Sequence, residues 1–254
     1  MDYHTLRVRY EEQVCYIQFY RPEANNTINY RMVIELSEVL KECDTSASII
    51  ILEGLSDVFC FGADFQGIHD DMTSHTESEN NPKLLYELWL KLVYGPYITI
   101  AHVRGKANAG GVGFVAACDI VLADCTASFC LSELLFGLYP ACVLPFLIQR
   151  IGYQKANYMT LMTQSIGVET AYEWELVDAY DKNSESLLRK HLLRLKRLQK
   201  SAIKQYKSYI SQLRPNLYQE KEMAVQANVD LFKDRQIREW IYQFEEYGKF
   251  PWDK

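Results

Sequence analysis

The sequence predicts an α/β fold in which parallel strands are joined by helices, followed by a helical C-terminal region. Three observations support it. Short apolar runs have the length of buried strands, glycine-bearing turns follow several of them, and the segments between carry apolar residues at helical spacing. After residue 184 the strand signals nearly vanish, and leucines at positions 187, 188, 192, 195 and 198 predict a long helix. We therefore expect a core over residues 1–184 and a helical oligomerisation region over residues 185–254, which packs on the core or on a neighbouring subunit.

The individual elements follow from local pattern. Residues 30–43 carry apolar side chains at helical spacing, and Asn29 before them is a typical N-cap. Residues 83–94 show the same pattern, which Gly95 and Pro96 end. The polar, acidic segment 70–82 has no periodicity and predicts a mobile surface loop. The predicted strands cover residues 5–10, 14–20, 49–54, 58–61, 98–103, 119–124 and 128–132.

Composition is that of a soluble globular protein. Of the 254 residues 48% are hydrophobic, which suffices for a large core, and 27 basic against 33 acidic residues give a net charge of −6. Non-specific nucleic-acid binding needs an excess of positive charge, so nucleic acid is not expected as a partner. No apolar run is long enough to span a bilayer, and the first residues lack the apolar stretch of a signal peptide. We expect a cytoplasmic protein.

The spacing of cysteines and histidines predicts neither a metal site nor a catalytic triad. The seven cysteines form no CxxC pair and mostly lie in apolar contexts, so we interpret them as reduced, buried thiols. Of the five histidines only His102 lies within an apolar run, and backbone groups are the expected partners of its ring.

Two glycine-bearing turns carry the strongest chemical signal. The first spans residues 61–65 (FGADF) after a predicted strand, and the second spans residues 108–113 (NAGGVG) at the start of a predicted helix. A helix N-terminus leaves backbone N–H groups without partners, and glycine lets a ligand approach them closely. Two such donors facing one thioester oxygen would stabilise an enolate. Taken alone, each turn is explained as well by tight packing.

Together, these turns resemble the crotonase (enoyl-CoA hydratase/isomerase) superfamily. The resemblance covers nearly the whole chain, through RPEANNTIN (21–29), FCFGADF (59–65), HVRGKANAGGVGFVAACDIVLAD (102–124) and SFCLSELLFGLYP (128–140). It implies a crotonase-type spiral of ββα units with a helical C-terminal region, and a trimeric assembly. It also implies an oxyanion hole formed by the backbone N–H groups of Ala63 and Gly110.

The resemblance further assigns a catalytic carboxyl group. Hydratases of this superfamily use two glutamates, one on each side of the water that is added or removed. Glu133 matches the second, whereas Gly113 stands where the first is expected, and we interpret that glycine as room for a bulkier substrate. Apolar sequence on both sides of Glu133 predicts burial and a raised pKa, which suits a group that donates and accepts a proton near neutral pH. Without the resemblance, a buried structural glutamate would explain the position.

Three further polar residues are candidates for substrate contact. Asp64 belongs to the first turn, where it is either a cap for the helix that follows or a catalytic group. Asn108 and Tyr139 lie close in sequence to positions that match the superfamily.

Several stretches of the sequence resemble one group within the superfamily more closely than they resemble the superfamily as a whole. RPEANNTIN, FCFGADF, HVRGKANAGGVGF, SELLFGLYPACVLPFLIQRIG and GKFPW are similar to the enoyl-CoA hydratase-like dehydratases of bacterial polyketide β-branching cassettes. This resemblance implies a hydro-lyase that converts 3-hydroxy-3-methylglutaryl on an acyl carrier protein to 3-methylglutaconyl. It implies no cofactor other than the phosphopantetheine or CoA that carries the substrate. The implied partners are the acyl carrier protein, other cassette enzymes and further copies of the chain, in a trimer or hexamer.

The implied mechanism is elimination of water through an enolate. With one glutamate, Glu133 would remove the α-proton and then protonate the departing hydroxyl, as a syn elimination permits. The distal carboxylate of the substrate needs a cation, for which Lys91, Arg104 and Lys106 are candidates. Two alternatives stay open: an enoyl-CoA isomerase or hydratase that acts on acyl-CoA, and a non-catalytic crotonase-like interaction subunit.

The net charge is unevenly distributed. Between residues 184 and 214 nine basic residues stand against Glu185 alone, a local charge of +8. Such a segment is either a solvated helix face or a surface that attracts an acidic carrier protein or phosphate groups. Charge reversal at Lys196 and Arg197 would separate these two interpretations.

Overall fold

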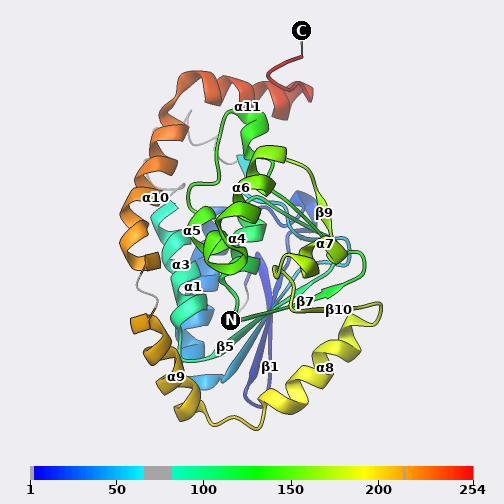
Figure 1. Ribbon diagram of the computed structural model, residues 1–254, viewed down its shortest axis with the longest axis vertical. Coiled ribbons are helices and arrows are strands. Elements are labelled where there is room, and N and C mark those ends of the chain that lie inside the picture. The colour runs from blue at the N-terminus through cyan, green and yellow to red at the C-terminus, as the bar shows by residue number, and fades with distance from the viewer. Residues whose placement is uncertain (1–2, 66–81, 214–215, 254) are drawn as a thin grey trace.

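A six-stranded sheet in the order β1-β2-β3-β5-β7-β10 forms the centre of the computed structural model, which describes residues 3–65, 82–213 and 216–253 (Figure 1). β1 and β2 form an antiparallel hairpin at one edge, and the other neighbours in this sheet run parallel. The strands are β1 (Leu6–Glu11), β2 (Val14–Phe19), β3 (Ile49–Glu53), β5 (Ile98–Val103), β7 (Ile120–Asp124) and β10 (Ala179–Asp181).

A second, smaller sheet holds β4, β6, β8 and β9 in that order. The first three are parallel, and β9 runs antiparallel to β8. Consecutive strands of the chain alternate between the two sheets, because β3, β5 and β7 enter the large sheet while β4, β6 and β8 enter the small one. This alternation is the expected spiral of ββα units. The strands are β4 (Val58–Cys60), β6 (Lys106–Asn108), β8 (Ser128–Cys130) and β9 (Ile166–Gly167).

The central strands are mostly apolar because both faces of the large sheet are covered. All five residues of β3 are buried. On one face Ile49 and Ile51 pack with Leu188 and Leu192 of α8 (Ser184–Leu195). The opposite face meets the helices that follow the strand pairs.

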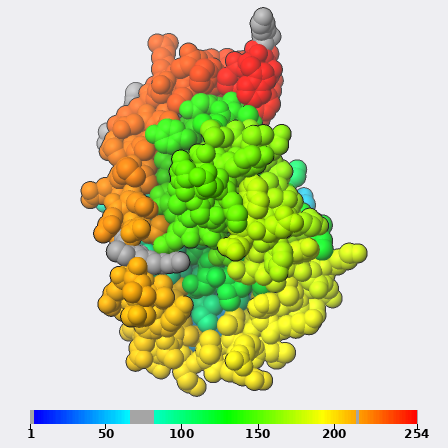
Figure 2. Space-filling model, viewed as in Figure 1, coloured from blue at the N-terminus to red at the C-terminus, as the bar shows by residue number. Residues whose placement is uncertain are grey.

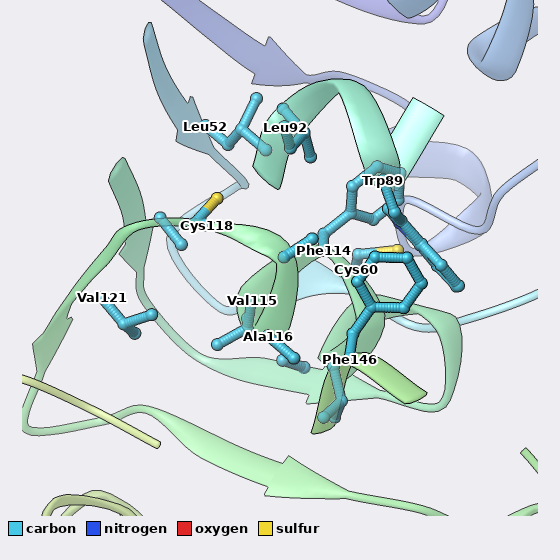
Figure 3. Close-up of a cluster of buried hydrophobic side chains, with 14 of the residues drawn as sticks. Leu52, Cys60, Trp89, Leu92, Phe114, Val115, Ala116, Cys118, Val121 and Phe146 are labelled. Atoms are coloured by element: carbon cyan, nitrogen blue, oxygen red, sulfur yellow. The ribbon is translucent and has the colours of Figure 1, made fainter. Parts of the chain in front are cut away.

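Helices α1 and α4 both contact α3, and the three helices enclose the main core. Asn29 caps α1, as predicted, since its Oδ1 accepts a hydrogen bond from the Met32 N–H at 2.9 Å. In the core, the Trp89 ring lies edge-on to Phe114 and Phe146, with centroid distances of 5.8 and 5.5 Å (Figure 3). These helices are α1 (Tyr30–Ser46), α3 (Pro82–Tyr94) and α4 (Gly110–Ala117). The loop predicted over residues 70–82 lies, except for its last residue, outside the described residues.

Helices make up the described chain after β10, as predicted, but the first of them is shorter than expected. α8 ends at Leu195, before the last leucine of the predicted pattern, and the Gln13 side chain donates a hydrogen bond to the Lys196 carbonyl at 2.7 Å. Figure 1 shows α9 and α10 along one side of the molecule and α11 at the end opposite α8 and α9, and Figure 2 shows the same arrangement as surface. These helices are α9 (Lys200–Leu213), α10 (Asn216–Lys233) and α11 (Arg235–Tyr247).

Three short helices between β8 and β10 were not evident from the hydrophobic pattern: α5 (Leu144–Ile151), α6 (Tyr153–Met162) and α7 (Val168–Glu173). Two 3₁₀ helices, η1 (Pro22–Ala24) and η2 (Glu133–Phe136), lie in the loops near the candidate site. None of the helices in the described ranges is both long and apolar enough to cross a bilayer. All seven cysteines are free, and five of them are buried.

Candidate active site

The two glycine-bearing turns meet because the strands that precede them are neighbours. β4 and β6 pair in parallel, with Cys60 opposite Ala107, so the turns after their carboxyl ends lie side by side. A Cβ added to Gly62 would lie 2.8 Å from the Ala109 Cβ and 3.5 Å from the Gly110 nitrogen. Gly62 also has a φ of +96°, which side-chain-bearing residues rarely adopt. Glycine at position 62 therefore permits the contact between the turns.

Two backbone N–H groups at this contact are left available. Ile28 bridges to the first turn, where its N–H donates to the Gly62 carbonyl at 2.7 Å and its carbonyl accepts from the Asp64 N–H at 3.1 Å. In this parallel bridge the N–H of Ala63 itself points away from Ile28. Gly110 is the first residue of α4, so its N–H has no acceptor within the helix. The structure thus brings Ala63 and Gly110 to one site.

The second turn is held in a strained backbone conformation that the sequence did not indicate. Ala109 has φ 49° and ψ −119°, a region that residues other than glycine seldom occupy. Its N–H donates to the Cys130 carbonyl of β8 at 2.9 Å, which fixes the turn to the small sheet. Strain of this kind concentrates at functional sites.

Glu133 lies beside these turns at the first position of η2. Its Oε2 is buried and has no hydrogen-bond partner within the described residues. Burial disfavours the ionised form, and it raises the pKa of Glu133 from 4.5 to about 7. The structure agrees with the predicted burial for the carboxyl group, although the residue as a whole is half-buried, and with the predicted direction of the pKa change. A carboxyl group with this pKa exists in both protonation states at neutral pH.

Two cavities meet at Glu133. The Trp89 cavity has a volume of about 130 Å³ and contains Trp89, Gly110 and Tyr139 in its wall. The Lys106 cavity has a volume of about 560 Å³ and contains Lys106 and Asn108. The two cavities share four lining residues, which are Ala63, Phe65, Ala109 and Glu133. Ala63 and Glu133 therefore lie where the two cavities meet, and Gly110 lines the Trp89 cavity beside them.

The three further candidates separate into two groups. Asp64 and Asn108 line the Lys106 cavity but have protein partners: Asp64 lies 2.8 Å from the Arg21 guanidinium, and the Asn108 side chain hydrogen-bonds to Ser132 Oγ at 3.0 Å. Tyr139 lines the Trp89 cavity and is 42% exposed. The helix that Asp64 was predicted to cap falls outside the described residues. Arg21, which the sequence did not single out, binds the carboxylate of Asp64.

Gly113 has a different role from the one predicted. The space beside it is filled by Trp89, because a Cβ at position 113 would lie 2.4 Å from Trp89 Cζ2. The interpretation that Gly113 makes room for a bulkier substrate is therefore wrong: the glycine makes room for an indole ring of α3. The ring in turn forms part of the wall of the cavity that holds Glu133.

We expect Gly113→Ala to lower the free energy of unfolding by about 1 to 2 kcal/mol. The overlap with Trp89 costs about 2 to 3 kcal/mol, the upper part of the range for overpacking, because 2.4 Å is far shorter than van der Waals contact; this cost exceeds the gain of about 1 kcal/mol from the better helix propensity of alanine. Urea denaturation measures the change. Adding Trp89→Phe should recover part of the loss, because the two positions are in contact. A stable Gly113→Ala protein would contradict the close packing.

The three predicted cations lie in different environments. Lys106 lines the cavity named after it. Arg104 pairs with Glu185, with 3.3 Å between Nη1 and Oε1. Lys91 lies in the last turn of α3 and lines neither cavity. Of the three, Lys106 is the cation placed beside Glu133 and the turns.

The basic segment lies away from this site. Described residues of α8 and α9 line neither cavity, and Figure 1 places these helices at the end opposite α11. Some of the charge is already neutralised, since Lys196 pairs with Glu12 at 3.0 Å and Lys207 with Asp119 at 2.6 Å. Within one chain, the structure gives no support to contact between this segment and a ligand at Glu133.

His102 is buried, as expected, but its partner is a side chain. Nδ1 lies 2.8 Å from Glu53 Oε1, because the register of β3 and β5 sets the two residues side by side. The expectation of a backbone partner is wrong. Among the described residues, Glu53, His102 and Glu185 form one set of possible metal ligands, which spacing alone did not reveal. Arg104 pairs with Glu185 and so supplies a positive charge to this cluster. None of the three possible ligands lines either cavity at Glu133.

A spiral of ββα turns that brings two backbone N–H donors and a carboxyl group to one site is typical of enzymes that act on thioesters. The enoyl-CoA hydratase/isomerase family model matches residues 9–254, and the chain belongs to this family. It is 56% identical to the bacillaene synthase dehydratase PksH of Bacillus subtilis, over 100% of this chain and 98% of the relative. The crotonase resemblance is confirmed.

Solved structures confirm the fold class. A crystal structure of a polyketide biosynthesis enoyl-CoA hydratase from Bacillus subtilis matches with a TM-score of 0.96 and 56% identity, over 98% of this chain and 100% of that chain. An enoyl-CoA hydratase from Bacillus halodurans, 21% identical, matches with a TM-score of 0.85 over 94% and 99% of the two chains. At that identity the likeness concerns the fold alone.

Proposed function

We propose that this chain is a dehydratase that removes water from 3-hydroxy-3-methylglutaryl on an acyl carrier protein and yields 3-methylglutaconyl in polyketide β-branching. The observation that carries the proposal is Glu133, the one acidic residue in the described wall of the Trp89 cavity, with a pKa of about 7, beside the two N–H donors of Ala63 and Gly110. The 56% identity to a dehydratase of bacillaene synthesis, over the whole chain, supports the reaction class and the pathway.

In the proposed reaction, the N–H groups of Ala63 and Gly110 donate hydrogen bonds to the thioester oxygen. This lowers the pKa of the α-proton, because the negative charge of the enolate gathers on that oxygen. Ionised Glu133 takes the α-proton, and the protonated carboxyl group then gives it to the hydroxyl on C3. The C–O bond breaks as the enolate re-forms the carbonyl, so one water leaves and Glu133 is ionised again.

The two cavities suit the two parts of the substrate. The Lys106 cavity is the larger and includes a cation, which favours the phosphopantetheine arm. The Trp89 cavity is small and lined mostly by apolar residues, which favours the branched carbon chain of the acyl group. The described residues of its wall include no lysine, arginine or histidine, so neutral donors would have to hold the distal carboxylate there. Asp64 and Asn108 would then stand beside the arm, and Tyr139 beside the acyl group.

The proposed partners are the carrier protein, the other enzymes of the cassette and further copies of this chain, in a cytoplasmic trimer or hexamer. Exposed large apolar side chains of α6, α8, α9 and α10 are the candidate contacts for such an assembly. Leu161, Leu193, Leu213 and Met223 are each more than half exposed, at 63%, 70%, 58% and 69%. Sedimentation at several protein concentrations tests the assembly.

The decisive experiment supplies 3-hydroxy-3-methylglutaryl on its carrier protein to the purified enzyme. Mass spectrometry of the intact carrier should show loss of one water, faster than with the same acyl group on free CoA. If water is retained while a 3-enoyl-CoA is isomerised, the isomerase alternative holds instead. Absence of both reactions would favour the non-catalytic alternative.

The proposed first step predicts that kcat/KM rises with pH around neutrality. Glu133 must be ionised to accept the α-proton, and half of it is ionised at a pH of about 7. Below that pH, kcat/KM should fall by about tenfold per pH unit. Initial rates from pH 5.5 to 8.5 measure the profile. A rate that falls as pH rises through 7 would show that protonated Glu133 starts the reaction.

A further inference from the structure

Trp89 has a hydrogen-bond donor that the protein does not use. The residue is 1% exposed, and its Nε1 has no hydrogen-bond partner within the part of the chain that the structure describes. The same side chain forms part of the wall of the Trp89 cavity, together with Glu133 and Gly110. The unpaired donor thus belongs to a residue of the cavity wall, although the nitrogen itself is buried and a ligand oxygen must press between neighbouring side chains to reach it.

The position of this donor is fixed by close packing. The Trp89 ring is held edge-on by Phe114 and Phe146 (Figure 3). On another side it abuts Gly113, where an added Cβ would lie 2.4 Å from Cζ2 and 3.0 Å from Cε2. Cε2 is bonded to Nε1, so the N–H edge of the ring lies near α4, the helix that begins at Gly110. A ring so confined does not swing out to find another acceptor.

An unpaired donor in a core costs free energy, and native proteins seldom leave one without a reason. The alternative to an acceptor in the protein is an acceptor in the ligand. Beyond the thioester, the proposed acyl group has two such acceptors, the hydroxyl on C3 and the distal carboxylate. Both must enter a cavity whose described wall, apart from Glu133 and Trp89, holds four polar side chains and no cation: Asn29, Tyr30, Tyr139 and Asn228.

We propose that Trp89 is a substrate-contact residue whose indole N–H donates a hydrogen bond to an oxygen of the acyl group at or beyond C3. This inference rests on the proposed dehydratase function. Indole keeps its proton, so Trp89 stabilises the oxygen without transferring a proton to it. Both proton transfers then fall to Glu133, and Gly113 serves the reaction by admitting the ring.

The test removes the N–H and keeps the ring. Benzothienylalanine at position 89 has sulfur in place of N–H and nearly the same shape, and Trp89→Phe is the simpler companion variant. We expect kcat/KM to fall by about tenfold for both variants, the effect of one lost hydrogen bond. The melting temperature of the sulfur analogue should not fall, since no hydrogen bond within the protein is lost. Trp252→Phe, at a residue that is 59% exposed, is the matched control and should leave kcat/KM unchanged.

Binding measurements distinguish the two possible oxygens. The product lacks the C3 hydroxyl but keeps the distal carboxylate. Weaker binding of substrate alone by the sulfur analogue assigns the hydrogen bond to the hydroxyl, and weaker binding of both assigns it to the carboxylate. Unchanged affinity for both carrier-bound acyl groups, or a lower melting temperature with unchanged kinetics, would overturn the proposal. Failure of the wild-type protein to release water overturns the dehydratase function instead, and the binding comparison still tests Trp89.

Discussion

Glu133→Gln is expected to lower kcat by about 10³-fold while the protein stays folded. The glutamine has nearly the same shape but neither accepts nor donates a catalytic proton, and such proton transfer contributes about 10² to 10⁴-fold to rates. The loss should lie at the upper end, because one carboxyl group performs two transfers in the proposed mechanism. Single-turnover assays with the carrier-bound substrate measure the chemical step.

The same substitution should make the protein more stable above pH 7. Burial raises the pKa of Glu133 in the folded protein from 4.5 to about 7, so between these values the folded state holds a proton that the unfolded state releases. Stability of the wild type therefore falls as pH rises through this window. Glutamine does not ionise, and at pH 8 we expect Glu133→Gln to exceed the wild type by an amount on the order of 2 kcal/mol. Urea denaturation at pH 5 and pH 8 measures the difference.

Glu35→Gln is the matched control, because Glu35 is a buried glutamate whose two carboxylate oxygens both accept hydrogen bonds, whereas Oε2 of Glu133 accepts none within the described residues. Its carboxylate accepts hydrogen bonds from the His4 N–H at 3.0 Å, from the Thr5 N–H at 2.9 Å and from Arg31 at 2.9 Å. Burial raises the pKa of Glu35, but the hydrogen bonds outweigh it and the pKa lies below its usual value.

Because the folded-state pKa of Glu35 is lowered, its contribution to stability is present above pH 4.5 and is lost as pH falls through the folded-state pKa. Glu35→Gln should therefore destabilise the protein at neutral pH, by about 1 to 3 kcal/mol, and leave kcat unchanged. A Glu133→Gln enzyme that retains its rate would remove Glu133 from the proposed mechanism, and a Glu35→Gln enzyme that loses its rate would show that the loss is not specific to Glu133.

The burial of Glu133 could be predicted from sequence because it depends on neighbours along the chain. Apolar residues precede and follow it, and local sequence of this kind predicts desolvation. The meeting of the two turns is different. It depends on the parallel pairing of β4 with β6, and residue spacing says nothing about which strands become neighbours. Here the resemblance to a known family, and not the pattern of residues, indicated that Ala63 and Gly110 share a site.

Gly113 and His102 show where prediction from sequence failed. A glycine inside a helix indicates that something approaches closely, but it does not indicate what, and Trp89 comes from another helix. Trp89 itself has the spacing of an ordinary core residue, and its unpaired N–H is evident only from the structure. The burial of His102 could be predicted from the apolar run around it. Its partner, Glu53, could not, because their contact depends on the register between two parallel strands.

Gly62→Ala is expected to lower kcat by about 10²-fold, although position 62 has no side chain to contribute to the reaction. The new Cβ would lie 2.8 Å from the Ala109 Cβ and 3.3 Å from the Asn108 carbonyl, so the two turns must separate. The N–H groups of Ala63 and Gly110 would then no longer converge on one oxygen. Loss of one such donor costs about 10² to 10³-fold in kcat in acyl-transfer enzymes.

Gly152→Ala separates this effect from backbone strain. Gly152 has a φ of +78°, close to the +96° of Gly62, so alanine carries a similar conformational penalty at both positions. A Cβ at Gly152 meets no atom within 4 Å, and the residue lines neither cavity. Both variants should lose stability, by about 1 kcal/mol from conformation alone, but Gly62→Ala alone should lose activity. The two variants differ in that only the Cβ at position 62 pushes the turns apart. Equal rates for the two variants would therefore show that the spacing of the turns does not govern catalysis.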